Sequence, residues 1–92
     1  MRKKVVAKPW GLEEHFVINK KVSVKMLSVM PKKRTSLQKH KHREEFWKIV
    51  EEPCKVRIGN RIIRAKKGEE FFIKKGQLHR LEGLNKKARV LE

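Results

Sequence analysis

Apolar and polar residues alternate with a period of two over much of the chain, the pattern expected of β-strands that bury one face. A long strand is predicted over residues 22–29, where Val22, Val24 and Met26 share one face. Shorter strands are predicted over residues 46–50, 71–73 and 88–91. No segment shows a sustained helical period. The pattern alone therefore predicts an all-β barrel or sandwich.

A β-hairpin is predicted over residues 54–65, because two alternating runs flank the pair Gly59-Asn60. Two-residue hairpin turns need positive φ, which glycine and asparagine adopt readily. Cys54 lies on the apolar face of the first run, and we interpret it as a buried core thiol. Trp10 follows a proline near the N-terminus, and we expect its ring to pack over the barrel rather than to serve as a stacking platform.

Histidine and glutamate residues gather in two segments, 38–47 and 76–79. In an extended strand, residues two apart share a face, so His40 and His42 would project together. Glu45 joins them if the chain bends near residues 43–44, and His79 completes the group from a neighbouring strand. Three imidazoles and one carboxylate suit Zn, Fe, Mn, Ni or Co and leave positions open for water or substrate. Alternatively, His40 and His42 lie on a solvated face of the basic run 39–43. We interpret the lone His15 as a polar surface residue.

Four segments carry a family resemblance: Lys8-Pro9-Trp10-Gly11, residues 36–47, residues 68–73 and residues 75–82. In this order and spacing they resemble the cupins, and within them the C-terminal domain of type II phosphomannose isomerases. The resemblance implies a small cupin β-barrel (a double-stranded β-helix or jelly roll) that extends over residues 1–92 as one domain. It also implies that His40, His42, Glu45 and His79 bind one divalent transition metal (Zn, Mn, Fe, Co or Ni).

The chain departs from the family pattern at several positions. Phe46 stands where a histidine commonly follows the ligand glutamate, and Lys32 stands where a glycine follows Pro31. The turn at Pro31-Lys32 must therefore form without glycine's freedom at positive φ.

The resemblance implies interconversion of mannose 6-phosphate and fructose 6-phosphate in carbohydrate metabolism. This reaction needs a proton-transfer base, for which Glu82 and Glu13 are candidates, and cations for the substrate phosphate, for which Arg80, Arg43 and Lys75 are candidates. Alternation along the strand would turn Arg80 away from the face of His79. A second hypothesis is a non-catalytic, metal-binding cupin that binds a sugar nucleotide, another anionic metabolite or an anionic partner.

Length and composition set further expectations. A domain of 92 residues buries a modest share of its surface, so we expect a homodimer. One cysteine excludes a disulfide within the chain, and the sequence has no apolar run long enough for a signal peptide or a membrane span. We therefore expect a cytoplasmic protein with no membrane partner.

The net charge is +16, from 26 Lys and Arg against 10 Asp and Glu. Such a field attracts anions. The partner that we expect is a phosphorylated sugar, which the resemblance implies, or another anionic small molecule. The sequence lacks exposed aromatics interleaved with basic residues and any known nucleic-acid module. Nucleic acid is therefore expected to bind only non-specifically, through charge.

Overall fold

The computed structural model describes residues 3–18, 23–51 and 53–92. These residues contain nine β-strands: β1 (Lys4–Lys8), β2 (Gly11–Ile18), β3 (Ser23–Val29), β4 (Glu45–Glu51), β5 (Cys54–Ile58), β6 (Arg61–Ala65), β7 (Glu70–Ile73), β8 (His79–Gly83) and β9 (Ala88–Leu91). No helix occurs among the described residues, so none of them forms a helix of the length and apolarity that crossing a bilayer requires. The all-β prediction is confirmed.

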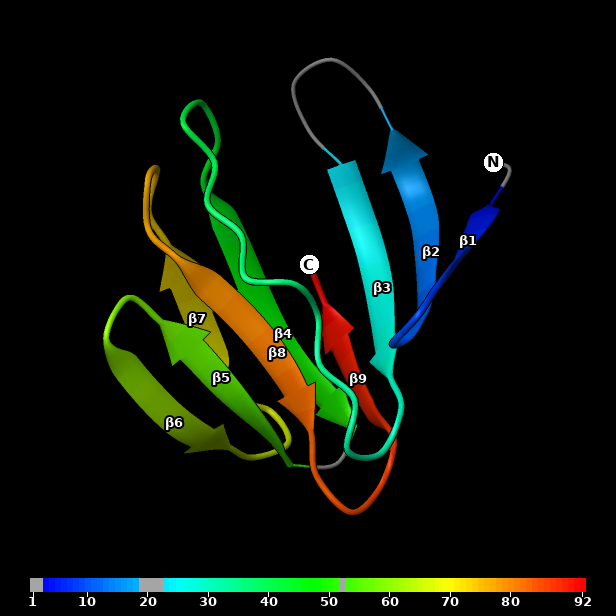
Figure 1. Ribbon diagram of the computed structural model, residues 1–92. Coiled ribbons are helices and arrows are strands. Elements are labelled where there is room, and N and C mark those ends of the chain that lie inside the picture. The colour runs from blue at the N-terminus through cyan, green and yellow to red at the C-terminus, as the bar shows by residue number, and fades with distance from the viewer. Residues whose placement is uncertain (1–2, 19–22, 52) are drawn as a thin grey trace.

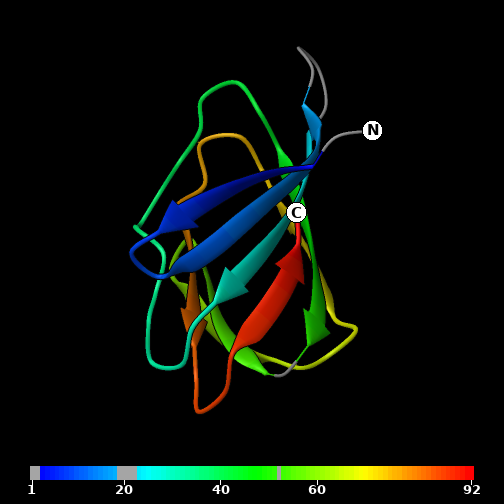
Figure 2. The same cartoon turned by 90° about the vertical axis from the view of Figure 1, so that its right-hand side faces the viewer.

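The strands form two antiparallel sheets that face each other (Figures 1 and 2). The larger sheet has six strands in the order β1-β2-β3-β9-β4-β7, and the smaller has three in the order β6-β5-β8. Strands distant in sequence become neighbours, since β9 lies between β3 and β4. The chain end at β9 is thereby brought to the middle of the larger sheet (Figure 1).

Alternate residues of both sheets fill the space between them. The side chains of Trp47, Ile49, Val56, Leu81 and Val90 are each at most 1% exposed. Trp10 joins the same core, which confirms the packing role predicted for it. Cys54 is fully buried in this core, as expected. Because inward and outward residues alternate, each strand gives the interior and the surface separate sets of side chains.

Several predicted elements are confirmed, the hairpin most closely. Residues 54–58 pair with residues 61–65 without a register shift. The predicted strands 46–50, 71–73 and 88–91 each lie within an observed strand. The predicted strand 22–29 is confirmed from Ser23 onward, whereas Val22 lies outside the described residues. The hairpin of β1 and β2 was not predicted from the alternation.

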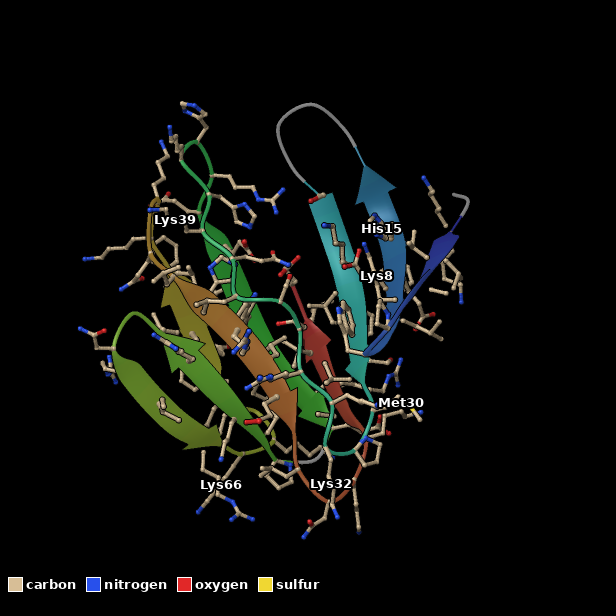
Figure 3. The ribbon with its side chains drawn as sticks, in the orientation of Figure 1. Lys8, His15, Met30, Lys32, Lys39 and Lys66 are labelled. Carbon is tan, nitrogen blue, oxygen red and sulfur yellow. The ribbon has the colours of Figure 1, made fainter. Side chains whose placement is uncertain are left out.

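The turn after β3 forms as the sequence suggested, with a residue other than glycine at positive φ. Lys32 has φ 59°, and it is the one described residue other than glycine with a positive φ. Its backbone N–H donates to the carbonyl of Leu84 at 3.0 Å. Lys32 and Met30 lie at the end of the molecule opposite Lys39 (Figure 3). The strained turn is therefore remote from the segment that carries His40.

Candidate metal centre

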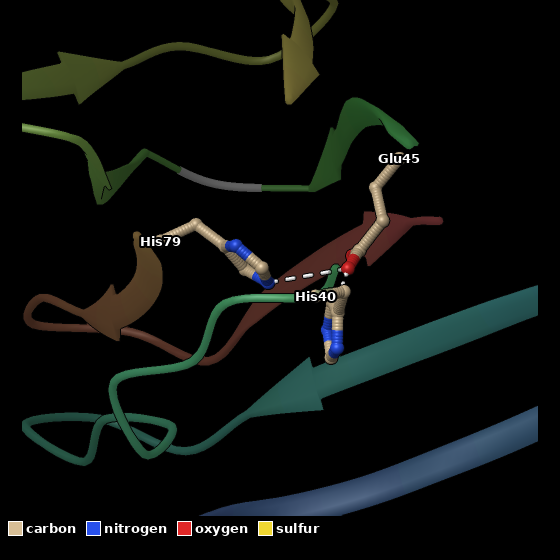
Figure 4. A group of neighbouring side chains, drawn as sticks. All are labelled: His40, Glu45 and His79. Carbon is tan, nitrogen blue, oxygen red and sulfur yellow. Dashed lines mark ion pairs between the residues drawn. The ribbon is translucent and has the colours of Figure 1, made fainter. Parts of the chain in front are cut away.

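Three predicted ligands, His40, Glu45 and His79, converge in the space between the sheets (Figure 4). Glu45 is the first residue of β4 in the larger sheet, and His79 is the first residue of β8 in the smaller sheet. His40 lies on the segment between β3 and β4, which is tied to β8 by a bridge between Gln38 and His79. The backbone N–H of Gly76 also donates to the carbonyl of His40 at 2.7 Å. Both sheets and two loops thus position the group.

The three side chains direct their polar atoms at one another. Oε2 of Glu45 lies 2.9 Å from Nε2 of His40 and 3.2 Å from Nε2 of His79. One potential ligand atom from each residue lies within 4.8 Å of the other two. Two nitrogens and one oxygen in this arrangement form a donor set suited to a divalent transition metal.

A hydrogen bond to the backbone leaves one ring nitrogen of His79 available to bind a cation. Its Nδ1–H donates to the carbonyl of Gln77 at 3.0 Å, which leaves Nε2 of the neutral ring as a bare lone pair directed inward. Nε2 of His79 and Oε2 of Glu45 are both buried and have no hydrogen-bond partner among the residues that the structure describes. Buried polar atoms without partners are rare and costly. A cation between these atoms would satisfy both, so the residues fit a metal ion.

Glu45 and His79 shift each other's pKa. Burial raises the pKa of Glu45, but interaction with His79 and its other neighbours outweighs burial and holds this pKa well below its usual range. Burial lowers the pKa of His79, but interaction with Glu45 and with the carbonyl of Gln77 outweighs it, so this pKa is raised. Without a metal, a proton on His79 compensates the buried carboxylate.

His40 behaves differently because a cation already contacts it. Its Nε2 lies 2.9 Å from Nη2 of Arg43 as well as from Glu45. Burial and the charge of Arg43 lower the pKa of His40, more than Glu45 raises it. His40 is therefore neutral near pH 7, and its Nε2 accepts a hydrogen bond from Arg43.

His42, the fourth predicted ligand, does not join the group of His40, Glu45 and His79. Its side chain is exposed. The prediction relied on the two-residue alternation of an extended strand, but residues 41–42 form a bend outside any strand. The alternation rule therefore does not apply to His40 and His42.

Glu92 lies beside the group, although no motif in the sequence indicated it. Its Oε2 accepts a hydrogen bond from Nε1 of Trp47 at 2.9 Å, while the same Nε1 contacts Oε1 of Glu45 at 3.2 Å. Burial and the carboxylate of Glu45 raise the pKa of Glu92 to about 7. Ala88 and Val90 are both buried, so continued alternation along β9 would have placed Glu92 on the inner face.

Among the predicted bases, Glu13 lies near the group and Glu82 does not. Glu13 lines a small interior cavity together with His79 and Trp47, but its Oε1 lies 2.8 Å from Nε2 of His15. His15 is thus partly buried and paired, and its interpretation as an ordinary surface residue was wrong. Glu82 lies on the opposite face of β8 from His79 and is 3.9 Å from Lys55.

The three predicted phosphate-binding residues differ in where they lie relative to the group. Arg43 contacts both His40 and Glu45. Lys75 is exposed in the turn between β7 and β8, next to the glycine that contacts His40. Arg80 faces away from His79, as strand alternation predicted, and its Nε donates to the carbonyl of Thr35.

Phe46 lies beside the group of His40, Glu45 and His79 rather than in it, and it lines the neighbouring cleft. It follows Glu45, so alternation turns its side chain to the outer face of β4, where it is 48% exposed. There it pairs with Phe72 of β7 in the cross-strand register. A histidine at position 46 would point outward for the same reason.

A cleft of about 410 Å³ borders the group where β3, β4 and β9 meet. The charged residues that line it are Lys25, Arg43, Glu44, Glu45 and Glu92. Val24, Phe46 and Leu91 supply an apolar part of the wall. Carboxylates and cations thus lie side by side in the cleft, which shares Glu45 with the group.

Comparison with solved structures defines the class of fold. The chain resembles an RmlC-like cupin from Shewanella frigidimarina with a TM-score of 0.86 and 13% identity, over 98% of this chain and 80% of the other. A predicted oxalate decarboxylase from Thermotoga maritima gives a TM-score of 0.81 and 19% identity, over 97% and 87% of the two chains. The protein therefore has the cupin fold.

Comparison of sequences assigns the protein to one family. Residues 1–91 match the family model described as mannose-6-phosphate isomerase C-terminal, and the chain belongs to this family. It is 31% identical over 81 residues to the xanthan biosynthesis protein XanB of Xanthomonas campestris and 33% identical over 81 residues to a mannose-1-phosphate guanylyltransferase of Escherichia coli. Each match covers 88% of this chain but 17% of the relative's length.

Proposed function

We propose that the chain acts as a metal-dependent sugar-phosphate isomerase module that interconverts mannose 6-phosphate and fructose 6-phosphate. The carrying observation is the group of His40, Glu45 and His79, in which a buried nitrogen and a buried oxygen lack partners. The adjacent cleft of about 410 Å³ falls within the usual range for small-molecule sites. Membership of the mannose-6-phosphate isomerase C-terminal family supports the choice of substrate.

His40, Glu45 and His79 would hold one divalent transition metal, with Zn, Mn, Fe, Co and Ni as the candidates. Such an ion polarises sugar oxygens and stabilises the negative charge that develops on them during enolisation. Nε2 of neutral His40 has a single lone pair, which Arg43 now occupies. An ion at this nitrogen would displace the guanidinium of Arg43, which would then be available for the substrate phosphate.

The isomerisation moves a proton from C2 of the aldose to C1 of the ketose, so it requires a group that takes and returns a proton. Glu92 is the better placed carboxylate, because it lines the cleft and lies beside Glu45. Trp47 and Lys25 hold its two oxygens, at 2.9 and 3.7 Å. Glu13 is the second candidate, but its carboxylate is already paired with His15. We therefore assign proton transfer to Glu92 rather than to Glu82 or Glu13.

The test is an NMR assay of metal-loaded protein with mannose 6-phosphate, in which the appearance of fructose 6-phosphate is followed. We expect turnover in the parent protein, its loss in His79→Ala and its retention in His42→Ala, the matched control. Glu92→Gln should lower kcat at least about 100-fold, the usual contribution of a general base, while metal affinity changes little. Turnover that is retained in His79→Ala, or no turnover with any of the five metals, would contradict the proposal.

A non-catalytic, metal-binding cupin that binds a sugar nucleotide or another anionic metabolite is the second candidate. One observation favours it: Glu13 is paired with His15 and Glu82 faces outward, so neither base predicted from the sequence is free at the cleft. Saturation-transfer NMR on the same samples separates the candidates. Ligand contacts that need His79 but yield no product would favour binding alone.

A further inference from the structure

The outer face of the three-stranded sheet carries a concentration of positive charge. Residues of β5 and β8 alternate, so that Val56 and Leu81 point into the core while their neighbours point outward. The segment that contains Arg34 lies beside β8 through a bridge to Glu82. This basic face comprises Arg34, Lys55, Arg57, Arg64 and Arg80, with Glu82 as its carboxylate.

Two arginines at the centre of the basic face oppose each other directly. Arg57 on β5 is the cross-strand partner of Arg80 on β8. Like charges in this position destabilise a sheet, because the side chains are close neighbours. Within the described part of the chain, neither guanidinium has a carboxylate at ion-pair distance. The fold therefore keeps an uncompensated pair of positive charges on a partly buried surface.

Both guanidinium groups are held in place through one nitrogen. Nε of Arg57 donates to the carbonyl of Gly59 at 3.1 Å, and Nε of Arg80 donates to the carbonyl of Thr35 at 2.9 Å. The two terminal Nη groups of each arginine take no part in these bonds. Anchored guanidinium groups lose less side-chain entropy when they bind an anion, and their planar donors match phosphate oxygens.

The surface is hollowed where the two arginines meet. A depression of about 150 Å³ is lined by Arg34, Lys55, Arg57, Ile62, Arg80 and Glu82. Its one carboxylate, Glu82, lies 3.9 Å from Lys55. Three arginines in this lining thus remain without an acidic partner among the described residues.

We propose that the basic face is a binding site for a compact polyphosphate, such as pyrophosphate or the diphosphate group of a nucleotide. Adjacent strands lie about 4.8 Å apart, so Arg57 and Arg80 present two cationic groups at a spacing suited to neighbouring phosphoryl groups. The depression is small, and no aromatic residue lines it to stack a nucleic-acid base. These features favour a small anion with several charges over a nucleic-acid strand.

The basic face is separate from the metal centre. Arg80 and His79 are consecutive residues on β8 and point to opposite sides of the sheet. The inference therefore does not depend on the proposed isomerase function. Loss of the metal in His79→Ala should leave polyphosphate binding unchanged.

The test is a calorimetric titration of the whole chain with inorganic pyrophosphate at about 0.15 M ionic strength, where long-range attraction is screened. We expect the double variant Arg57→Gln/Arg80→Gln to bind at least about tenfold more weakly, which corresponds to about 1.4 kcal/mol. Glutamine at position 80 keeps an N–H donor for the carbonyl of Thr35. The variant should also unfold at the same or a higher temperature, because it removes a like-charge pair.

The matched control is Lys66→Gln/Lys67→Gln, which removes the same two charges in the exposed segment before β7. It should weaken pyrophosphate binding less than about twofold, and ¹⁵N amide shifts induced by pyrophosphate should centre on residues 55–57 and 80–82. Equal weakening in both double variants would show attraction by net charge alone and overturn the proposal. Tighter binding of a single-stranded oligonucleotide than of pyrophosphate at this face would overturn it as well.

Discussion

His79 and Glu45 meet across the interior of the protein with Nε2 and Oε2 3.2 Å apart, and neither atom has a hydrogen-bond partner within residues 3–18, 23–51 and 53–92. They come from opposite sheets, so the contact joins β8 to β4. A bare imidazole nitrogen and a carboxylate oxygen repel each other unless a positive charge lies between them. The pair can therefore be satisfied in two ways, by a proton on His79 or by a metal ion.

The first prediction is that a divalent transition metal raises the unfolding temperature through this group. His79→Ala should weaken metal affinity by at least about 10- to 100-fold, which is the usual effect of losing a residue that only supports a metal ligand. Metal at about 100 times its dissociation constant would stabilise the parent by about 2.7 kcal/mol. Calorimetric metal titrations and thermal melts of both proteins measure these effects.

His42→Ala is the control for this prediction, since it also removes a histidine but from an exposed bend. It should bind metal like the parent protein. A loss of affinity as large as that of His79→Ala would show that His42 joins the group as a fourth ligand when metal binds.

The second prediction concerns pH in the metal-free protein. The folded pKa of Glu92 is raised from 4.5 to about 7, so its stabilising contribution is present below 4.5 and is lost as the pH rises toward 7. His79 also has a raised pKa, and its contribution is lost as the pH rises through that pKa. Glu45 has a lowered pKa, and its contribution is lost as acid is added below about 4.5. The free energy of unfolding should therefore be greatest near pH 5 and decline toward pH 8.

Urea denaturation in the presence of a chelator, at several values between pH 4 and pH 8, measures this dependence. Glu92→Gln should flatten the decline between pH 5 and pH 7, because the amide does not titrate. A parent protein whose midpoint is constant from pH 5 to pH 8 would show that Glu92 and His79 titrate alike in the folded and unfolded states.

The sequence predicted the fold well where one physical rule decided the outcome. Alternation and the Gly59-Asn60 turn were sufficient for the hairpin of β5 and β6, whose register has no shift. The β1 strand could not be predicted in this way, because Val5 is 53% exposed and Val6 is only partly buried. A strand whose two faces are both largely exposed shows little alternation of apolar and polar residues.

The site was predicted in part for a similar reason. Glu45 and His79 are the first residues of strands, so the pairing of those strands determines where their side chains point. His42 lies in a bend, where the alternation of side chains along a strand does not apply. Glu92 belongs to no histidine or glutamate motif, and the signal that points to it is the alternation of the buried residues Ala88 and Val90. Arg80 was correctly expected to turn from His79, since both lie on one regular strand.

The third prediction is that Lys32→Gly stabilises the protein. Lys32 has φ 59°, a conformation that costs an L-residue with a side chain about 1–2 kcal/mol and glycine very little. Glycine's greater freedom in the unfolded chain offsets about 0.5–1 kcal/mol of this gain. The expected net increase in the free energy of unfolding is about 0.5–1 kcal/mol, measured by urea denaturation.

Lys33→Gly makes the same change in charge at the next residue, which has no positive φ. It should leave stability unchanged or lower it by about 0.5–1 kcal/mol through entropy alone. If both variants gain equally, the gain reflects relief of charge repulsion in this very basic chain rather than backbone strain.

The fourth prediction is that Cys54 reacts with thiol reagents only when the chain opens. Its side chain is fully buried, and burial raises the pKa of the thiol to about 11. The thiolate is the reactive form, so at pH 8 the folded protein contains little of it and admits little reagent. Reaction with a coloured disulfide reagent should therefore be slow in buffer and rapid in denaturing urea. Its rate in buffer should fall further when metal is added, because the metal opposes opening of the core. Rapid labelling of the folded protein, at a rate that metal does not change, would show that β5 opens independently of the metal centre.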